Sequence, residues 1–359
     1  MTPTRTLHDL GQSLWIDNIT RDMLDDGTLA AHIAERDVTG LTSNPTIFEH
    51  AVAAGDAYDG SIRASHERGR DGEEAFFDLA IEDLTRAADL FRPVHDRTAG
   101  VDGFVSLEVS PLLARNTADT IKWAKDLHAT AGRPNLYIKI PGTPEGLPAI
   151  EESIFGGIPI NVTLLFDAKQ YVAAADAYLR GIERRVAAGL DPNVPSVASI
   201  FISRWDVAVH DQVPAELKNR LGIAVVQQAY VAYLELLASA RMQRLQNEGA
   251  RPQRALWAST GTKDPEASDT LYIEAFASPL TVNTMPEKTL LAFADHGKVD
   301  APLARDGADS ADVIAAHEQA GVSVDALAER LQVEGADAFV KSWRSMLDRI
   351  ASKSQALTA

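Results

Sequence analysis

Hydrophobic and polar residues along the chain form two alternating patterns. Short runs rich in β-branched and apolar residues are separated by longer segments whose apolar residues recur at helical spacing. This alternation is typical of βα units that build a parallel sheet. The predicted strands are Leu14–Asn18, Gly40–Asn44, Gly103–Val109, Leu136–Ile140, Ile158–Phe166, Ser196–Ile202, Ala255–Ser259 and Leu280–Thr284. The predicted helices between them are Asp22–Arg36, Glu73–Phe91, Asn116–Ala131, Ala168–Ala188, Ala215–Asn247 and Ser268–Ala277.

The predicted strands favour a closed (β/α)8 barrel, the TIM barrel, over an open sheet. Several of them alternate apolar and polar residues, whereas the strands of an open doubly wound sheet are nearly continuous apolar runs. Polar side chains that point into a barrel mouth explain the alternation. We therefore predict one α/β barrel domain over residues 1–359, with a barrel core over about 13–295.

Both ends of the chain carry predicted helices outside the barrel. Thr4–Gln12 is expected to form an extra helix that closes the barrel floor. A C-terminal helical extension over about 296–359 follows the last strand, with a Gly- and Asp-rich surface loop from His296 to Asp309. The predicted helices after the last strand are Pro286–His296, Ser310–Ala320, Val324–Gln332 and Ala336–Ser352.

One lysine stands out within the predicted strands. Lys139 lies between Ile138 and Ile140 in a segment that ends with Pro141-Gly142. A lysine buried without a partner is costly, so it tends to lose its proton and become an amine nucleophile. An edge-strand lysine that reaches solvent would give the same local sequence, and this segment alone leaves both interpretations open.

Other side chains capable of chemistry follow strand by strand. In a barrel, residues near the carboxyl ends of the strands converge at one mouth, where active sites of this fold lie. The candidates are Asp17, Asn44, Glu108, Lys139, Asn161, Thr163, Ser199, Arg204, Ser259 and Lys263. Glu108 is notable because Leu107 and Val109 flank it, and a buried carboxylate needs a partner or a raised pKa.

Most of these candidates also have a purely structural interpretation. Asp17 could cap a helix, Asn44-Pro45 is a common turn, and Thr163 and Ser199 are ordinary strand residues. Arg204 and Lys263 could be solvated charges. Their joint occurrence on successive strands is what favours a functional site.

Composition narrows the classes of function. The net charge of −17 argues against nucleic-acid binding and against attraction to an anionic membrane, so an anionic substrate would need local cations. The chain has no Cys, which excludes disulfides and thiolate chemistry. The N-terminus lacks the apolar core of a signal peptide, and no apolar run is expected to be long enough to span a bilayer, so we expect a cytoplasmic protein.

Several catalytic signatures are missing from the sequence. The nine His show no metal-ligand spacing, and no Ser-His-Asp arrangement or Gly-rich nucleotide fingerprint occurs. An enzyme that uses lysine and needs no cofactor is the simplest hypothesis that remains.

Four segments of the chain resemble transaldolase, in the family's order and at similar separations. They are Leu41–Phe48, Ser106–Ser110, Tyr137–Gly142 and Asn161–Phe166. The resemblance implies a class I aldolase-type α/β barrel with the Schiff-base lysine on the fourth strand, where Lys139 falls. It also implies transfer of a dihydroxyacetone unit from sedoheptulose 7-phosphate or fructose 6-phosphate to an aldose phosphate, in the pentose phosphate pathway. Sugar phosphates are then the expected partners, with monomer and homodimer both left open.

The resemblance also implies roles for the candidates. Lys139 would attack the ketose carbonyl, and Asp17 would move the C4 hydroxyl proton during cleavage and addition. Glu108 and Thr163, with a shared water, would shuttle protons while the imine forms. Asn44 and Asn161 would hold substrate hydroxyls or the imine region, and Ser199 and Arg204 match the family's phosphate-binding pair.

The chain departs from the family pattern at two points. Many members carry a second arginine after the seventh strand, where this chain has Ser259-Thr-Gly-Thr-Lys263, so Lys263 with Ser259 is expected to supply that phosphate contact. The chain also exceeds the commonest family length, with extra residues expected in Ala51–Ala99 and near the C-terminus, and these are expected to leave the mechanism unchanged.

Two alternative functions remain. One is a fructose 6-phosphate aldolase-like lyase that releases free dihydroxyacetone. The presence of Glu108 and of the long C-terminal region favours the transferase, because the shorter aldolases that resemble this family lack both. The other is an inactive barrel that serves as a binding module, which the intact set of candidates disfavours.

Overall fold

The strands close into a parallel barrel in a computed structural model that describes residues 2–358. Each strand pairs with its neighbour in sequence, and β1 closes the ring against β8, which confirms the predicted (β/α)8 fold. The strands are β1 (Ser13–Ile16), β2 (Val38–Leu41), β3 (Val105–Glu108), β4 (Leu136–Pro141), β5 (Ile160–Leu165), β6 (Ser196–Phe201), β7 (Arg254–Ala258) and β8 (Val282–Met285).

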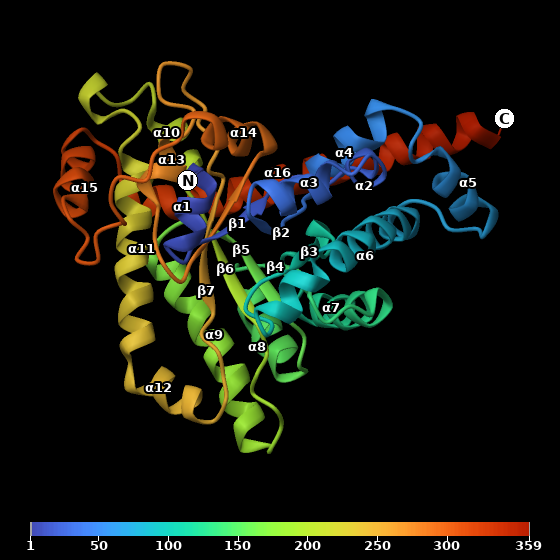
Figure 1. The fold of residues 1–359 in the computed structure, drawn as a ribbon, viewed down its shortest axis with the longest axis horizontal. Coiled ribbons are helices and arrows are strands. Elements are labelled where there is room, and N and C mark those ends of the chain that lie inside the picture. Colours follow the sequence, from blue (N-terminus) through green and yellow to red (C-terminus); the bar gives the residue numbers. More distant parts are fainter. Residues whose placement is uncertain (1, 359) are drawn as a thin grey trace.

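Helices surround the barrel, as Figure 1 shows. Those before β5 are α1 (Pro3–Asp9), α2 (Arg21–Asp25), α3 (Thr28–Glu35), α4 (Pro45–Ala54), α5 (Asp59–Glu67), α6 (Glu73–Arg97), η1 (Pro111–Leu113), α7 (Thr117–Ala131) and α8 (Gly146–Phe155). Those after it are α9 (Ala168–Ala187), α10 (Ser203–Val209), η2 (Ala215–Leu217), α11 (Leu221–Ala238), α12 (Ala240–Asn247), α13 (Leu271–Ala275), α14 (Glu287–His296), α15 (Ser310–Gln319) and α16 (Val324–Thr358). Helices α4, α5, α8 and α10 were not predicted from the sequence.

Two of the predicted helices are broken into shorter ones. The segment Asp22–Arg36 divides into α2 and α3 at Gly27, whose φ of 83° is left-handed and interrupts a helix. The segment Ala215–Asn247 divides into η2, α11 and α12. Ser239 takes extended backbone angles between the last two, and its side chain accepts a hydrogen bond from the Met242 N–H to cap α12.

The two helices predicted at the C-terminus are one continuous helix, α16, drawn in red in Figure 1. Gly335, which lies between the two predicted helices, is inside α16. A Cβ at this position would lie 2.9 Å from Leu164 and 3.2 Å from Arg204. The glycine therefore permits α16 to approach the barrel closely. Further along, α16 packs against α4 and α5. The single-domain organisation of residues 1–359, the two ends of which lie outside the described residues, stays a prediction.

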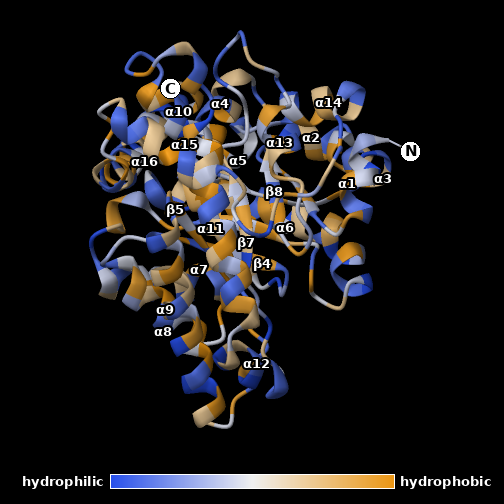
Figure 2. Cartoon of the chain, turned by 90° about the vertical axis from the view of Figure 1, so that its left-hand side faces the viewer, coloured by the Kyte–Doolittle hydropathy of each residue, from blue (hydrophilic) through white to orange (hydrophobic). Residues whose placement is uncertain are grey.

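One segment differs from the expectation that no apolar run is long enough to span a membrane. Ala215–Ala238 meets the length and composition criteria for a span, so that expectation was wrong as stated. Half of its apolar window is nevertheless buried inside the protein, and α11 packs against α9 and α15. Figure 2 shows hydrophobic and hydrophilic residues interleaved on the outer helices. The partial burial of α11 and its contacts with neighbouring helices are typical of a helix that packs on the outside of a barrel.

Candidate active site

Three polar side chains form one layer inside the barrel. Lys139 on β4 is in register with Glu108 on β3 and with Asn161 on β5. Strand alternation directs these side chains inward, opposite to those of Ile138 and Ile140. Only 5% of Lys139 and 4% of Glu108 are exposed. The predicted burial of Lys139 is therefore seen, and the edge-strand alternative does not apply.

Lys139 has a buried counter-ion. Its Nζ lies 3.2 Å from Glu108 Oε2 and donates a hydrogen bond to the Ser43 carbonyl at 3.3 Å. Neither Glu108 oxygen makes a well-directed hydrogen bond with the described residues. Burial raises the pKa of Glu108, and the charge on Lys139 opposes this rise. Lys139 is thus a buried amine with a carboxyl group beside it, whereas the sequence had suggested a lysine without a partner.

Asp17 follows directly after β1 at the rim of the barrel. Its Oδ1 accepts a hydrogen bond of 2.8 Å from the Thr42 hydroxyl, which itself lies 2.7 Å from the Thr284 hydroxyl. Burial raises the pKa of Asp17, while the charge on Lys139 and the Thr42 hydrogen bond act in the opposite direction. Asp17 is thus a carboxylate held in a fixed orientation near the lysine.

Asn161 and Thr163 share one face of β5 but differ in their hydrogen bonding. Asn161 Oδ1 accepts a hydrogen bond from the Ser199 hydroxyl at 2.7 Å, and its Nδ2 donates to Ser106 at 3.1 Å. The hydroxyl proton of Ser199 is therefore used in the hydrogen bond to Asn161. Thr163 is buried, and its hydroxyl has no hydrogen-bond partner among the described residues. Of these side chains, the Thr163 hydroxyl is the one left free to exchange a proton with a substrate.

Asn44 has the structural role that its sequence context suggested. It is the N-cap of α4, and its Oδ1 accepts a hydrogen bond from the Ile47 N–H at 3.1 Å. The side chain nevertheless lines the cavity described below. Capping engages the side-chain oxygen and leaves the amide NH2 outside the cap.

Arg204 is a cation without a carboxylate partner within ion-pair distance in residues 2–358. Its guanidinium lies 5.2 Å from the Phe201 ring centre and 5.9 Å from that of Phe339. Burial lowers the pKa of Arg204, and the negative charge of Glu108 opposes this. An arginine held between two aromatic rings at the edge of a cavity is well placed to bind a phosphate.

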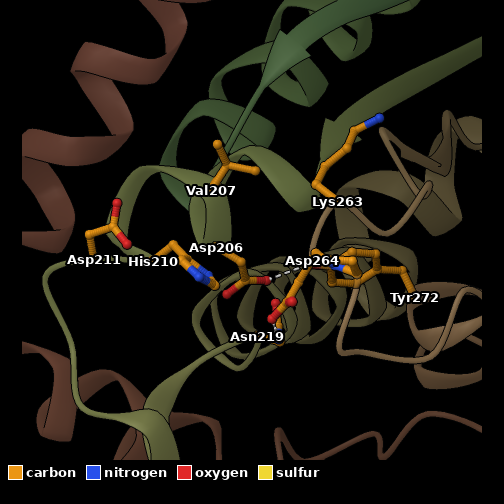
Figure 3. A pocket seen from close by; sticks show the side chains of 9 residues that line it. Asp206, Val207, His210, Asp211, Asn219, Lys263, Asp264 and Tyr272 are labelled. Carbon is orange, nitrogen blue, oxygen red and sulfur yellow. Dashed lines mark hydrogen bonds between the residues drawn. The ribbon is translucent and has the colours of Figure 1, made fainter.

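Ser259 and Lys263 lie in the segment that follows β7. Ser259 has a φ of 55°, an uncommon value for a residue with a side chain, and its hydroxyl lies 2.8 Å from that of Ser203. Lys263 is exposed and borders two cavities. In one of these, Figure 3 shows its amine directed away from Asp206 and Asp264.

One cavity of about 310 Å³ at the carboxyl ends of the strands collects most of these residues. The predicted residues among its lining are Asp17, Asn44, Lys139, Thr163, Ser199, Arg204, Ser259 and Lys263. Glu108 and Asn161 share the layer of Lys139 but do not line this cavity. Glu108 contacts Lys139, and Asn161 hydrogen-bonds to Ser106 and Ser199. No group of three or more His, Asp or Glu side chains arranged to hold a metal occurs in the described part of the chain.

The C-terminal helix contributes residues that sequence reasoning missed. Phe339 lines the cavity, and its ring centre lies 5.6 Å from Lys139 Nζ. Gln332 donates hydrogen bonds to the carbonyls of Gly142 at 3.1 Å and Leu164 at 3.0 Å, which ties α16 to the ends of β4 and β5. The C-terminal extension therefore forms part of the wall of the cavity.

Comparison with known proteins places the chain in a family. The model of the transaldolase/fructose-6-phosphate aldolase family matches residues 14–350. A transaldolase from Thermobifida fusca is 47% identical over 99% of this chain and 100% of its own length. Transaldolases from Frankia alni and Thiobacillus denitrificans are 43% and 42% identical, over 98% of this chain and over 97% and 100% of their own lengths. The site geometry and these matches agree, and the chain belongs to the transaldolase/fructose-6-phosphate aldolase family.

Proposed function

We propose that this protein is a transaldolase that transfers a dihydroxyacetone unit from a ketose phosphate to an aldose phosphate. The observation that carries the proposal is the buried Lys139–Glu108 pair, 3.2 Å apart, at a cavity that also holds Asp17 and Arg204. The similarity to curated transaldolases over nearly the full chain favours the transferase over the lyase alternative. The expected donors are sedoheptulose 7-phosphate and fructose 6-phosphate.

The reaction begins with the imine. The Lys139 amine attacks the ketose carbonyl carbon, and water leaves from the carbinolamine. Burial of Glu108, which raises its pKa, supports a role in which this carboxyl accepts the ammonium proton and later returns it to the departing hydroxyl. The free Thr163 hydroxyl would relay that proton.

Carbon–carbon cleavage follows. Asp17 takes the proton from the C4 hydroxyl, the C3–C4 bond breaks, and the protonated imine accepts the electron pair to give an enamine on Lys139. The aldose phosphate formed from the other half leaves. The enamine then attacks the aldehyde of the acceptor, Asp17 returns the proton to the new hydroxyl, and water hydrolyses the product imine.

The cover supplied by α16 supports transfer over release. The enamine must persist until an acceptor binds, and a site that excludes water protects such an intermediate. Phe339 places an aromatic ring over Lys139, and Gln332 fixes the helix that carries it. We also propose that the enzyme acts in the cytoplasm on free sugar phosphates, without nucleic-acid or membrane partners, whether as a monomer or as a homodimer.

Product analysis distinguishes transfer from release. With fructose 6-phosphate and erythrose 4-phosphate, we expect sedoheptulose 7-phosphate and glyceraldehyde 3-phosphate in equal amounts. Without the acceptor, turnover should stop after formation of the enzyme-bound enamine. The reason is that Phe339 of α16 lies over Lys139 and limits the access of water, which would release dihydroxyacetone. Steady accumulation of free dihydroxyacetone, measured by chromatography, would identify a lyase. No reaction under either condition would support the binding-module alternative.

Arg204 is proposed to bind the phosphate. Arg204→Gln should raise KM for fructose 6-phosphate by roughly 10- to 100-fold with a smaller change in kcat, because a charge-assisted contact to a remote phosphate stabilises ground and transition states alike. Steady-state kinetics would measure both constants, with the exposed Arg344→Gln as the matched control. A similar loss on unphosphorylated fructose would count against this role.

A further inference from the structure

A second cavity lies at the opposite end of the barrel from Lys139. It has a volume of about 650 Å³ and is bordered by the amino ends of strands, including Ser13 of β1, Tyr137 of β4, Ser196 of β6 and Arg254 of β7. Its walls are largely apolar and include Leu237 of α11, with further apolar side chains at the rim. Nothing in the proposed transfer reaction uses this cavity, which is large enough for a small organic molecule.

A buried phenol opens onto the cavity without a protein partner. Tyr137 is only 2% exposed, and its ring stacks on Phe104 with 4.3 Å between ring centres. Its hydroxyl makes no hydrogen bond with any residue in the range 2–358. The hydroxyl is not among the fully buried unpaired atoms, so it is open to the cavity and available to a ligand atom.

Two arginines supply positive charge at the same place. Arg254 donates hydrogen bonds to the Ser13 hydroxyl at 2.6 Å and to the Thr281 carbonyl at 2.7 Å. Arg251 donates to the Ala99 carbonyl at 2.6 Å. These are neutral acceptors, and within residues 2–358 neither arginine lies in ion-pair distance of a carboxylate. Both guanidinium groups are thus held in position while their charges stay uncompensated.

One acid, Asp102, borders the cavity, and one of its two carboxylate oxygens accepts hydrogen bonds from neutral donors. Asp102 Oδ1 accepts hydrogen bonds from Trp15 Nε1 at 2.8 Å and from the Gly103 N–H at 3.0 Å. The positive charges therefore exceed the negative charge along this wall, in a protein whose net charge is −17. Such local excess favours an anionic ligand.

We propose that this cavity binds a small aromatic carboxylate. The carboxylate would accept hydrogen bonds from Arg251 and from the Tyr137 hydroxyl, Arg254 would add positive charge, and the ring would lie against the apolar wall. The proposal depends on this cavity alone and is independent of the transfer chemistry at Lys139.

Isothermal titration calorimetry with 1-naphthoate tests the proposal. We expect saturable binding of one molecule per chain, and much weaker binding of the uncharged 1-naphthalenemethanol. Tyr137→Phe removes only the unpaired hydroxyl and should weaken binding about 3- to 10-fold. Arg251→Gln should weaken it roughly 10-fold or more, because a charge-assisted hydrogen bond is lost. Arg349→Gln, on the exposed face of α16, should leave binding unchanged.

Three results would overturn the proposal. The first is no heat of binding at about millimolar naphthoate. The second is displacement of naphthoate by fructose 6-phosphate, which would place the binding at the Lys139 cavity. The third is a dimer in sedimentation that Leu280→Asp dissociates, since a second copy would then fill this face through the exposed Leu280. Circular dichroism and thermal melting of each variant would establish that it is folded.

Discussion

Replacement of Lys139 by methionine should abolish dihydroxyacetone transfer, with a loss of roughly 10⁴-fold or more, because the amine beside Glu108 that forms the imine is removed. Methionine suits this test because Lys139 is 95% buried, and an unbranched side chain of similar length leaves no cavity. The measurement is the rate of sedoheptulose 7-phosphate formation. Treatment with fructose 6-phosphate and borohydride should add the mass of the reduced adduct to the wild-type protein at Lys139 and to no residue of the variant.

Lys139→Arg is the matched control for charge. It keeps a cation beside Glu108 but cannot form an imine, so it should be as inactive as Lys139→Met while losing less stability. Lys139→Met leaves Glu108 without its nearest counter-ion, and the melting temperature should fall accordingly. A borohydride adduct on another lysine, or transfer by either variant near the wild-type rate, would contradict the assignment of Lys139.

The barrel and the position of its reactive lysine could be predicted because both depend on local pattern. Alternation within short strands, separated by helical segments, indicates the (β/α)8 fold. The lysine between Ile138 and Ile140 left a buried and an edge-strand position open, and the candidates on the other strands favoured the buried one. What the pattern could not indicate is which group faces it. Glu108 reaches Lys139 because β3 and β4 pair in a register that places the two residues side by side.

The contribution of α16 could not be predicted because it depends on contacts between distant parts of the chain. Phe339 and Lys139 are brought together only when the last helix crosses the barrel mouth. The approach depends on Gly335, where a side chain would collide with Leu164. It also depends on a bulge in β5, where Leu164 has a φ of 58° and turns its carbonyl to Gln332. Neither feature follows from hydrophobic periodicity.

The polar network inside the barrel also refines the interpretation of single residues. Ser199 and Asn161 hydrogen-bond to each other at 2.7 Å. Because the Ser199 hydroxyl donates to Asn161, its remaining capacity toward a phosphate is as an acceptor, which an anion does not favour. Arg204 has no such engagement. Within the predicted phosphate pair, the arginine is therefore the member whose removal should affect substrate binding.

Replacement of Asp17 by asparagine should slow cleavage by about 10²- to 10⁴-fold while imine formation continues, because general base catalysis is lost and the nucleophile is kept. Asparagine preserves the volume of the side chain and can still accept the hydrogen bond from Thr42. Borohydride trapping with fructose 6-phosphate should therefore give the Lys139 adduct in near-normal yield, whereas formation of glyceraldehyde 3-phosphate should fall. Loss of trapping together with transfer would show that Asp17 acts in imine formation instead.

The pH dependence of the same variant provides an independent readout. Asp17 must be ionised to take the C4 hydroxyl proton, and burial raises its pKa. The single-turnover rate of cleavage by the wild type should thus fall as pH is lowered through this raised pKa, and recover above it. Asp17→Asn should have no such acid limb, since the titrating group is gone. The exposed Asp337→Asn should keep the wild-type profile. If Asp17→Asn kept the acid limb unchanged, another group would control cleavage, and Glu108, whose pKa is also raised by burial, would be the first to replace.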